Sequence, residues 1–177
     1  MREIELTQGQ KALVDDVDFE FLIQWKWHAR WNPTSRGYYA RRTESHSAAR
    51  ARGGSRRTIL MHRAVAERMG LEITGLDVDH IDRRSTLDNR RSNLRAATRS
   101  QGNMNQGASL GSTSRFKGVS WHKRDEKWDA KINKHGKRYH LGYFTDEADA
   151  ARAYDRAAAR LFGQFAVFNF PNEYHAA

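Results

Sequence analysis

The residues with the clearest chemical potential lie in the stretch VDHIDRRSTLDNRRSNLR, residues 78–95. Asp79 carries a carboxylate that can bind a metal ion, and His80 carries an imidazole that can take a proton from water near neutral pH. Hydrolysis of a phosphodiester needs both functions, because water must be activated and the charge of the transition state neutralised. Adjacent residues of a regular strand point to opposite faces, so the two side chains act together only on a bent or bulged strand. A lone histidine in such a loop would instead be expected to hydrogen-bond Asp82.

The charge of the chain indicates its class of partner. Lys and Arg number 31 against 21 Asp and Glu, a formal net charge of +10. This excess predicts a polyanion, with nucleic acid first and an anionic membrane second. Cysteine is absent, which excludes disulfides, thiolate zinc sites and cysteine nucleophiles. A metal site would have to use His, Asp, Glu, Asn or backbone oxygen, which favours a hard ion such as Mg²⁺ or Mn²⁺.

Membrane and secretion signals are not evident in the sequence. No apolar run approaches the roughly 20 residues that span a bilayer, and the first ten residues, MREIELTQGQ, lack the apolar segment of a signal peptide. We therefore expect a soluble, cytoplasmic protein with no membrane partner and no small-molecule cofactor.

An uncharged segment rich in Gly, Ser and Asn, residues 103–114, divides the chain. Such composition is typical of a flexible linker. The sequence predicts a first domain over residues 1–106, a linker over 107–113 and a second domain over 114–172.

The first half is predicted to be mixed in structure. Residues 12–31 are rich in β-formers and aromatics and predict short strands, as does GYYARR. Residues 44–57, ESHSAARARGGSRR, are interpreted as a solvated basic loop or, given the overall charge, as an arm that contacts phosphates. Residues 58–70 should begin extended and end as a helix at Gly70. A strand or hairpin is expected over residues 71–82, and a helix capped by Ser92 over residues 92–104.

The second half predicts a small sheet followed by one helix. Residues 115–123, 127–133 and 137–144 have strand character, and Trp128, Ala130 and Ile132 alternate with polar residues. The segment TDEADAARAYDRAAARLFG has the 3.6-residue repeat of a helix, with Thr145 as its N-cap and Gly163 at its end.

Four segments of the first half, MHR, VDHID, DNRRSNLR and ATRSQGNMN, together resemble the HNH endonucleases, most closely those of phage and homing-type enzymes. The resemblance implies a ββα-metal module in which a β-hairpin and a helix hold one divalent metal. It implies that His80 is the general base, that Asp79 is a metal ligand and that Asn93 holds the hairpin loop and orients the base. Arg90, Arg91 and Arg95, beside this site, are expected to contact the DNA backbone.

The last metal ligand is less well defined by the resemblance. In many relatives it falls where this chain has Gly102. Asn103 is the first candidate and needs a one-residue offset, whereas Asn105 lies three residues past Gly102 on nearly the same helix face.

Residues 114–171 resemble an AP2 DNA-binding domain, because KGVSW, LGYF, AARAYDRAA and NFP occur in the expected order and spacing. The family fold is a three-stranded antiparallel sheet backed by one helix, and the sheet lies in the DNA major groove. Plant members carry several arginines where this chain has Ser120, His122 and Asn133, so their G/C-rich preference is not expected here. By position, the residues that would face DNA are Lys117, Ser120, His122, Lys131, Asn133, Arg138 and His140.

Together these patterns predict an α+β chain in which an HNH module with N-terminal β-strands is linked to an AP2-like module. The expected function is a Mg²⁺- or Mn²⁺-dependent, homing-type endonuclease encoded by a phage or bacterium, acting on double-stranded DNA as a monomer or weak dimer. The alternative is a non-catalytic, sequence-specific DNA-binding regulator with a degenerate HNH half. A protein that binds or cleaves RNA is the second alternative.

Overall fold

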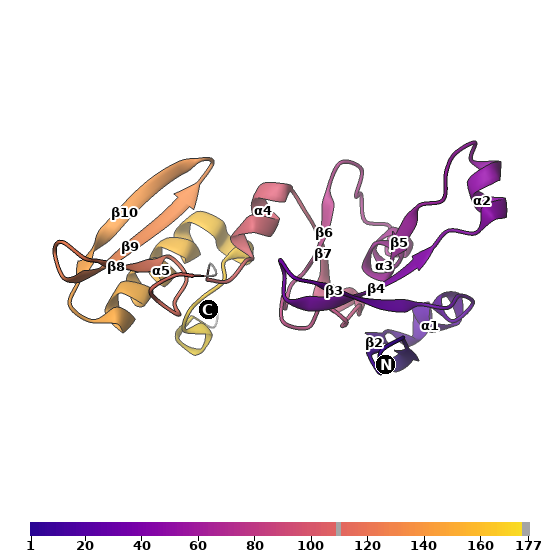
Figure 1. Ribbon diagram of the computed structural model, residues 1–177, viewed down its shortest axis with the longest axis horizontal. Coiled ribbons are helices and arrows are strands. Elements are labelled where there is room, and N and C mark those ends of the chain that lie inside the picture. The colour runs from indigo at the N-terminus through magenta and orange to yellow at the C-terminus, as the bar shows by residue number, and fades with distance from the viewer. Residues whose placement is uncertain (109–110, 175–177) are drawn as a thin grey trace. The chain divides into compact units, whose positions relative to one another are not determined.

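The computed structural model describes residues 1–108 and 111–174 and divides the chain into two compact units, Met1–Arg99 and Ser100–Ala177. The predicted linker, residues 107–113, includes residues 109–110, which lie outside the described part. Mixed helices and antiparallel sheets, as predicted, make up both units (Figure 1). Within the described ranges no helix is both long and apolar enough to cross a membrane.

The first unit is built from three small antiparallel sheets and short helices. The sheets are the hairpin β1–β2, the three-stranded β3–β4–β5 and the hairpin β6–β7. In chain order the elements are β1 (Arg2–Glu5), β2 (Lys11–Val14), α1 (Asp16–Leu22), β3 (His28–Asn32), β4 (Gly37–Thr43), α2 (His46–Ala51), β5 (Thr58–Leu60), α3 (Met61–Arg68), β6 (Asp77–His80), the 3₁₀ turn η1 (Arg91–Asn93), β7 (Leu94–Ala97) and α4 (Arg99–Met104), the last of which begins at the final residue of the unit.

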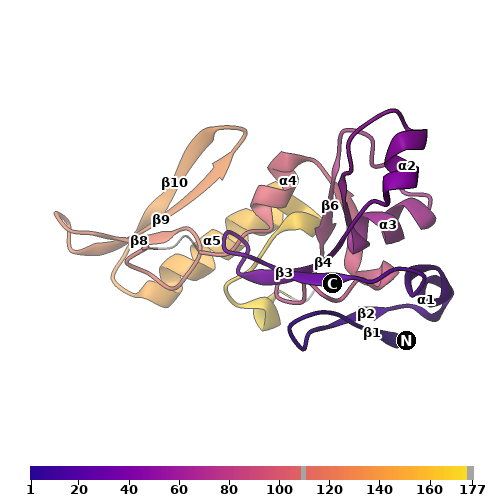
Figure 2. The same cartoon turned by 45° about the vertical axis from the view of Figure 1, so that its right-hand side comes forward.

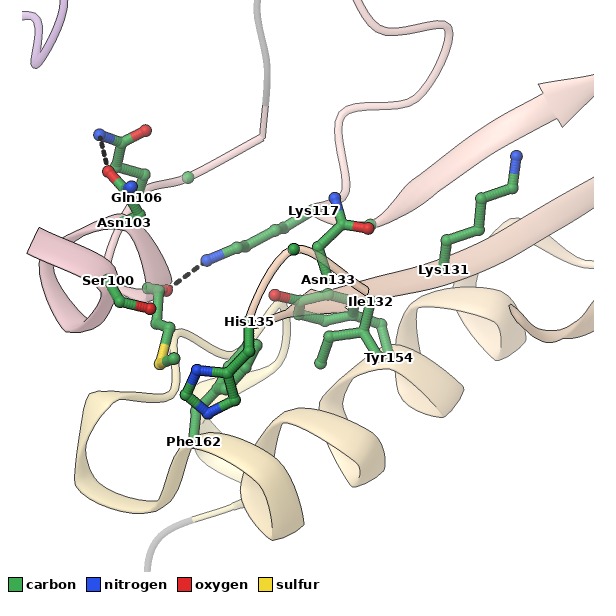
Figure 3. Close-up of a pocket in the computed structure, with 14 residues that line it drawn as sticks. Ser100, Asn103, Gln106, Lys117, Lys131, Ile132, Asn133, His135, Tyr154 and Phe162 are labelled. Carbon is green, nitrogen blue, oxygen red and sulfur yellow. Dashed lines mark hydrogen bonds between the residues drawn. The ribbon is translucent and has the colours of Figure 1, made fainter. Parts of the chain in front are cut away.

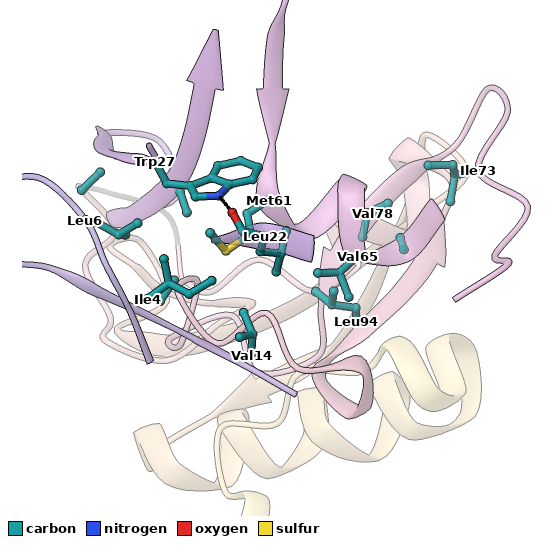
Figure 4. Close-up of a cluster of buried hydrophobic side chains, with 14 residues drawn as sticks. Ile4, Leu6, Val14, Leu22, Trp27, Met61, Val65, Ile73, Val78 and Leu94 are labelled. Carbon is teal, nitrogen blue, oxygen red and sulfur yellow. Dashed lines mark hydrogen bonds between the residues drawn. The ribbon is translucent and has the colours of Figure 1, made fainter. Parts of the chain in front are cut away.

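Trp27 is almost completely buried in the hydrophobic core of this unit, and its indole N–H donates to the Leu22 carbonyl at 2.8 Å (Figure 4). Helix α3 contributes Met61 and Val65, which are fully buried. The extended start and the helix predicted over residues 58–70 are confirmed by β5 and α3, and Gly70 follows with a positive φ of 74°.

Part of the predicted strand region, residues 12–31, is a helix instead. Helix α1 begins after Asp15 and carries Asp16 and Asp18 in its first turn, where negative charge is stabilised by the helix dipole. Asp18 and Leu22 are spaced four residues apart and both face the interior. The aromatic content of the segment suggested strands, but this spacing and the acidic first turn favour the helix.

The helix predicted over residues 92–104 is wrong in its first half. Residues Leu94–Ala97 form β7, which pairs with β6 in the register His80↔Leu94 and Asp77↔Ala97. Leu94 and Ala97 are buried by this pairing. Leu and Ala favour helices locally, but tertiary pairing overrides a weak propensity. The helix that follows, α4, begins only at Arg99.

The basic segment at residues 44–57 is not a loop throughout, because it contains helix α2. Ser45 caps α2, since its hydroxyl accepts from the Ala48 N–H at 3.2 Å. The capping signal of Ser45 was present in the sequence, but the two glycines and the density of arginine favoured a loop.

The second unit has the three-stranded antiparallel sheet and helix that the sequence predicts. The strands are β8 (Val119–His122), β9 (Lys127–Lys134) and β10 (Lys137–Phe144), in the order β10–β9–β8, and the helix is α5 (Glu147–Phe162) (Figure 2). Two 3₁₀ turns follow, η2 (Gly163–Phe165) and η3 (Pro171–Glu173). Ala130 and Ile132 of β9 pack against the alanine-rich face of α5, which includes Ala151, Tyr154 and Ala158.

The two ends of α5 differ in how well they were predicted. The N-cap is Asp146, whose carboxylate accepts from the Asp149 N–H at 2.9 Å, and Thr145 is therefore not the cap. Gly163 ends the helix with a positive φ of 52°, as predicted. Thr, Asp and Glu all suit a helix start, so the sequence located this end only to within one residue.

Gly118 allows the chain to pass closely over α5 before β8 begins. Its φ is 76°, and a Cβ at this position would overlap the ring of Tyr154 and lie 2.7 Å from the Lys131 carbonyl oxygen. The glycine therefore satisfies both a left-handed backbone and a close contact between backbone and ring.

We expect Gly118→Ala to destabilise the protein by about 2–4 kcal/mol, because it combines backbone strain with overpacking. Gly136→Ala is the matched control, since Gly136 has a φ of 74° but open space around its Cβ; strain alone should cost about 1 kcal/mol. Thermal unfolding of both variants measures the difference. Equal shifts for the two would show that the contact with Tyr154 is not restrictive.

Candidate nucleic-acid interface

Most of the predicted DNA-facing residues share the outward face of the β8–β9–β10 sheet. The register places Arg138 opposite Asn133 and His140 opposite Lys131, while Ser120 lies opposite Asp129. Since paired residues point to the same side of a sheet, these side chains form one continuous face, away from the residues that pack on α5. We call it the sheet face; its members are Ser120, His122, Asp129, Lys131, Asn133, Arg138, His140 and Tyr143.

Tyr143 belongs to the sheet face although its sequence position does not suggest it. A bulge between His140 and Gly142 shifts the register, so that Tyr143 pairs with Asp129. Its ring lies 4.7 Å from that of His140 and 5.1 Å from that of His122, and the side chain is exposed. Strict alternation from His140 assigns Tyr143 to the opposite side. The one signal for the bulge was the glycine within the strand.

Asp129 lies at the centre of the sheet face with only 2% of its surface exposed. Its carboxylate is 2.5 Å from the Lys131 ammonium and 3.2 Å from His140 Nε2. The carboxylate therefore pairs with Lys131 and lies close to the His140 ring, but its Oδ1 makes no hydrogen bond within the described residues. An acid surrounded in this way lowers the local positive charge but fixes the geometry of the groups around it.

Arg138 and Asn133 form a hydrogen-bonded pair of exposed side chains on the sheet face. Both are exposed, and Arg138 Nε donates to Asn133 Oδ1 at 3.4 Å, a long bond. A guanidinium can donate two bonds to guanine, and an amide can exchange two with adenine. These two side chains are therefore suited to contact base edges.

Lys117 is the predicted DNA-facing residue that the structure places elsewhere. Its ammonium donates to the Met104 carbonyl at the end of α4 and lies 5.9 Å from the Tyr154 ring. It lines a pocket of about 440 Å³ together with Asn103, Gln106 and Asn133 (Figure 3). Asn103, the first candidate for the last metal ligand, thus lies beside a lysine.

His80, the predicted general base, is buried in the first unit with 4% of its surface exposed. Its Nε2 is 3.2 Å from Asn89 Oδ1, and its ring contacts those of His62 and Tyr39. Burial lowers the pKa of His80, and the hydrogen bond between its Nε2 and Asn89 Oδ1 opposes this shift.

Asn89 is a residue whose importance the sequence did not reveal. It is 1% exposed, donates to the Leu87 carbonyl at 3.2 Å and has a backbone N–H that donates to the Leu13 carbonyl at 2.8 Å. Its sequence neighbourhood suggested only turn chemistry. The backbone N–H of Asn89 instead joins the 81–93 loop to Leu13 of β2, a long-range contact that no local pattern predicts.

Asn93 closes the same loop. Its side-chain oxygen accepts from the Asp82 N–H at 2.8 Å, and its amide donates to the Asp88 carbonyl at 2.9 Å. These two bonds span the loop between β6 and β7. A role for Asn93 in orienting His80 stays a prediction.

Asp79, the predicted metal ligand, forms an ion pair with its cross-strand partner Arg95. Arg95 Nη2 and Nε lie 2.9 and 3.0 Å from Asp79 Oδ2. Asp79 belongs to the first unit and Asn103 and Asn105 to the second. Over the described ranges no cluster of three or more His, Cys, Asp or Glu residues could hold a metal, and the Mg²⁺ or Mn²⁺ ion stays a prediction.

Arg90 and Arg91, predicted to contact DNA, are also engaged within the fold. Arg90 forms a two-pronged ion pair with Asp88 at 2.6 and 2.8 Å. Arg91 binds both oxygens of Asp18, at 2.7 and 2.9 Å, and Arg68 binds the same carboxylate at 2.8 Å. Asp18 is completely buried. Burial alone would raise the pKa of Asp18, but the hydrogen bonds from Arg91 and Arg68 outweigh it and hold the pKa below its usual value.

The chain is similar to plant AP2 proteins over about a third of its length. It is 50% identical over 60 residues to APETALA2-like protein 2 of Oryza sativa subsp. indica. Over 59 residues it is 42% identical to the AP2-like ethylene-responsive transcription factor At2g41710, and over 61 residues 39% identical to the ethylene-responsive transcription factor WRI1, both of Arabidopsis thaliana. These alignments cover 33–34% of this chain but only 13–14% of the relatives. No protein-family model matches the chain.

The similarity supports the predicted AP2-type DNA-binding domain, and the bounds predicted for it, residues 114–172, stay a prediction. It does not extend to an HNH part, for which neither the comparisons nor the fold gives evidence. The prediction of an endonuclease is contradicted, because the relatives are named as transcription factors, which are not hydrolytic enzymes, and none of them is a nuclease. A phage origin likewise has no support.

We expect Arg91→Ala to lower stability by roughly 2 kcal/mol, because it leaves the buried Asp18 carboxylate with Arg68 alone. Lys11→Ala is the control, since Lys11 pairs with exposed Glu3 and Glu5 and such surface pairs contribute little. Thermal unfolding distinguishes the two. Arg91→Ala with wild-type stability and weakened DNA binding would instead assign Arg91 to the DNA contact.

The stability of the first unit should fall in mild acid. Burial lowers the pKa of His62 to about 3, and the charges of His80 and Arg63 act in the same direction. The unfolded chain, in which this histidine has its ordinary pKa of 6.5, takes up a proton first as the pH falls. His62 should therefore remove roughly 1.4 kcal/mol of stability per pH unit below about pH 6.5, until its folded form also titrates near pH 3.

Chemical denaturation of wild type and His62→Phe across this pH range measures the effect, and His62→Phe should show a shallower loss. His28→Phe, at an exposed position of β3, should retain the wild-type dependence. An unchanged slope in His62→Phe would mean that His62 is not the source.

Proposed function

We propose that the protein is a sequence-specific DNA-binding protein of the regulator type, which binds double-stranded DNA through the sheet face. The observation that carries this proposal is the convergence of Asn133, Arg138 and His140 on one exposed side of a three-stranded sheet. The curated relatives, named as AP2-type transcription factors, support the same class of function.

The shape and chemistry of the sheet face suit the major groove. A narrow antiparallel sheet fits a groove about 12 Å wide, where each base pair displays a distinct pattern of donors and acceptors. Arg138 and Asn133 are placed to contact base edges, whereas Lys131, held by Asp129, is placed to contact phosphate. The face lacks the arginines that plant members have at Ser120, His122 and Asn133, so its preferred sequence should differ from theirs.

Selection from a pool of randomised duplexes tests the proposal. Wild type should enrich a defined site, and Arg138→Ala should bind that site about 5–150-fold more weakly, because it loses one base-edge contact of about 1–3 kcal/mol. Arg156→Ala is the control, since Arg156 is exposed on α5, the helix that backs the sheet. If Arg138→Ala no longer prefers the selected site over other duplexes, Arg138 contacts bases. If it only binds all duplexes more weakly, Arg138 contributes charge alone.

Two outcomes would contradict the proposal. One is that wild type enriches no duplex sequence. The other is that single-stranded or structured RNA displaces the duplex more effectively than unlabelled duplex at the same salt concentration.

A further inference from the structure

The basic segment at residues 44–57 is an ordered excursion of the first unit. It leaves the end of β4 and returns at the start of β5, where Thr43 pairs with Thr58. Helix α2 lies at its outer end (Figures 1 and 2). We call this excursion the arm.

A single buried carboxylate organises the arm. Glu44 is 5% exposed, and its side chain accepts from Arg52 Nη2 at 2.8 Å. Arg57 Nε lies 3.6 Å from the other carboxylate oxygen, and the Glu44 carbonyl accepts from Arg56 Nε at 2.7 Å. Because Arg52, Arg56 and Arg57 all converge on one residue, the return path of the arm is fixed by Glu44.

One acid cannot neutralise this set of cations. The arm contains Arg50, Arg52, Arg56 and Arg57 against Glu44 alone, so four positive charges less one negative charge leave +3. Arg50 is exposed and has no ion pair or hydrogen bond to another side chain in the described part of the chain. The Arg57 side chain is 63% exposed despite its contact with Glu44. The arm therefore presents to solvent the guanidinium group of Arg50, which has no side-chain partner in the described ranges, and that of Arg57, which stays largely exposed beside Glu44.

The surroundings of these groups suit a phosphate backbone. An open depression of about 890 Å³ is lined by Arg50 and Arg56 together with His46, Ser47 and Ser55. Hydroxyls and guanidinium groups are the side chains that commonly contact phosphate oxygens. None of the large apolar side chains exposed in the described ranges lies in the arm. A membrane-binding segment would need an apolar face to enter the lipid boundary. The lack of exposed apolar side chains in the arm therefore argues against a membrane as its partner.

We propose that the arm is a second, sequence-independent contact to duplex DNA, in which Arg50 and Arg57 bind backbone phosphates. The proposal rests on the proposed function, since the sheet face selects the duplex and the arm adds affinity for the same molecule. Because both units belong to one chain, binding by one raises the effective concentration of the other.

Salt dependence measures the number of phosphate contacts directly. Each contact contributes about 0.9 to the slope of log binding constant against log salt concentration. For the full chain on a fluorescently labelled duplex, Arg50→Gln/Arg57→Gln should make the slope shallower by about 1.8, with weaker binding at low salt. Arg50→Gln alone changes a position without a partner side chain in the described ranges and should make the slope shallower by about 0.9. This single variant replaces the double variant if the double variant unfolds.

The matched control is Arg156→Gln/Arg160→Gln, which removes the same two charges from exposed positions of α5. Its slope should match that of wild type, because these residues lie on the helix that backs the sheet. Thermal unfolding of each variant verifies that the fold is intact.

The outcomes separate the two proposals. If Arg138→Ala weakens binding but the arm variants keep the slope of the α5 control, the arm proposal fails and the sheet-face proposal stands. If the arm variants lower the slope while Arg138→Ala binds normally, the sheet-face proposal fails and the arm is a DNA contact in its own right. Failure of wild type to bind duplex DNA, or preference of the arm-dependent binding for RNA, would overturn the arm proposal.

Discussion

A buried carboxylate has to be paired, because removing a charge from water costs several kcal/mol unless opposite charges and hydrogen bonds replace the lost hydration. Asp18, Glu44 and Asp129 are all nearly inaccessible, and each is surrounded by more than one basic side chain. Asp18 joins α1 to α3 and to the 81–93 loop through Arg68 and Arg91. Glu44 fixes the arm, and Asp129 fixes the centre of the sheet face. These three buried acids hold several basic groups inside the fold, whereas buried Asp155 accepts from Asn169 and from the backbone N–H of Phe170 instead.

The same constraint separates two kinds of arginine that look alike in the sequence. Arg90, Arg91 and Arg95 lie in a dense basic run, yet each is bound to a carboxylate of its own unit. Arg50 and Arg138 lie in less conspicuous positions but remain exposed, without an acid beside them in the described ranges. A net charge of +10 predicts a polyanionic partner. The surface that meets that partner depends on where the acids are buried, and burial of an acid is a tertiary property.

Most of the second unit was predictable because the secondary structure that each segment favours locally is also the one that buries its apolar side chains in the fold. The alternation of Trp128, Ala130 and Ile132 matches the small-residue stripe of α5, so the two elements specify each other. The bulge after His140 was not predictable from alternation, and with it Tyr143 was missed. In the first unit, local secondary-structure propensity and tertiary pairing conflict. Residues 94–97 have helical propensity but pair as β7, because only the pairing with β6 buries Leu94 and Ala97.

The pattern that first suggested catalysis shows how far residue type alone can lead. Asp79, His80 and Asn93 carry functional groups that phosphodiester hydrolysis can use. The fold uses each group internally: Asp79 pairs with Arg95, His80 is packed with His62 and Asn89, and Asn93 ties the loop. A general base needs access to water, and a metal ligand needs a carboxylate that is not already committed. Asp79 and His80 find Arg95 and Asn89 within the same stretch of sequence, but His80 also packs against His62 of α3, and Asn89 is tied to Leu13 of β2, which no short motif contains. Asp79, His80 and Asn93 therefore take part in contacts that hold this region of the fold together, and a catalytic role for them has no support from the relatives.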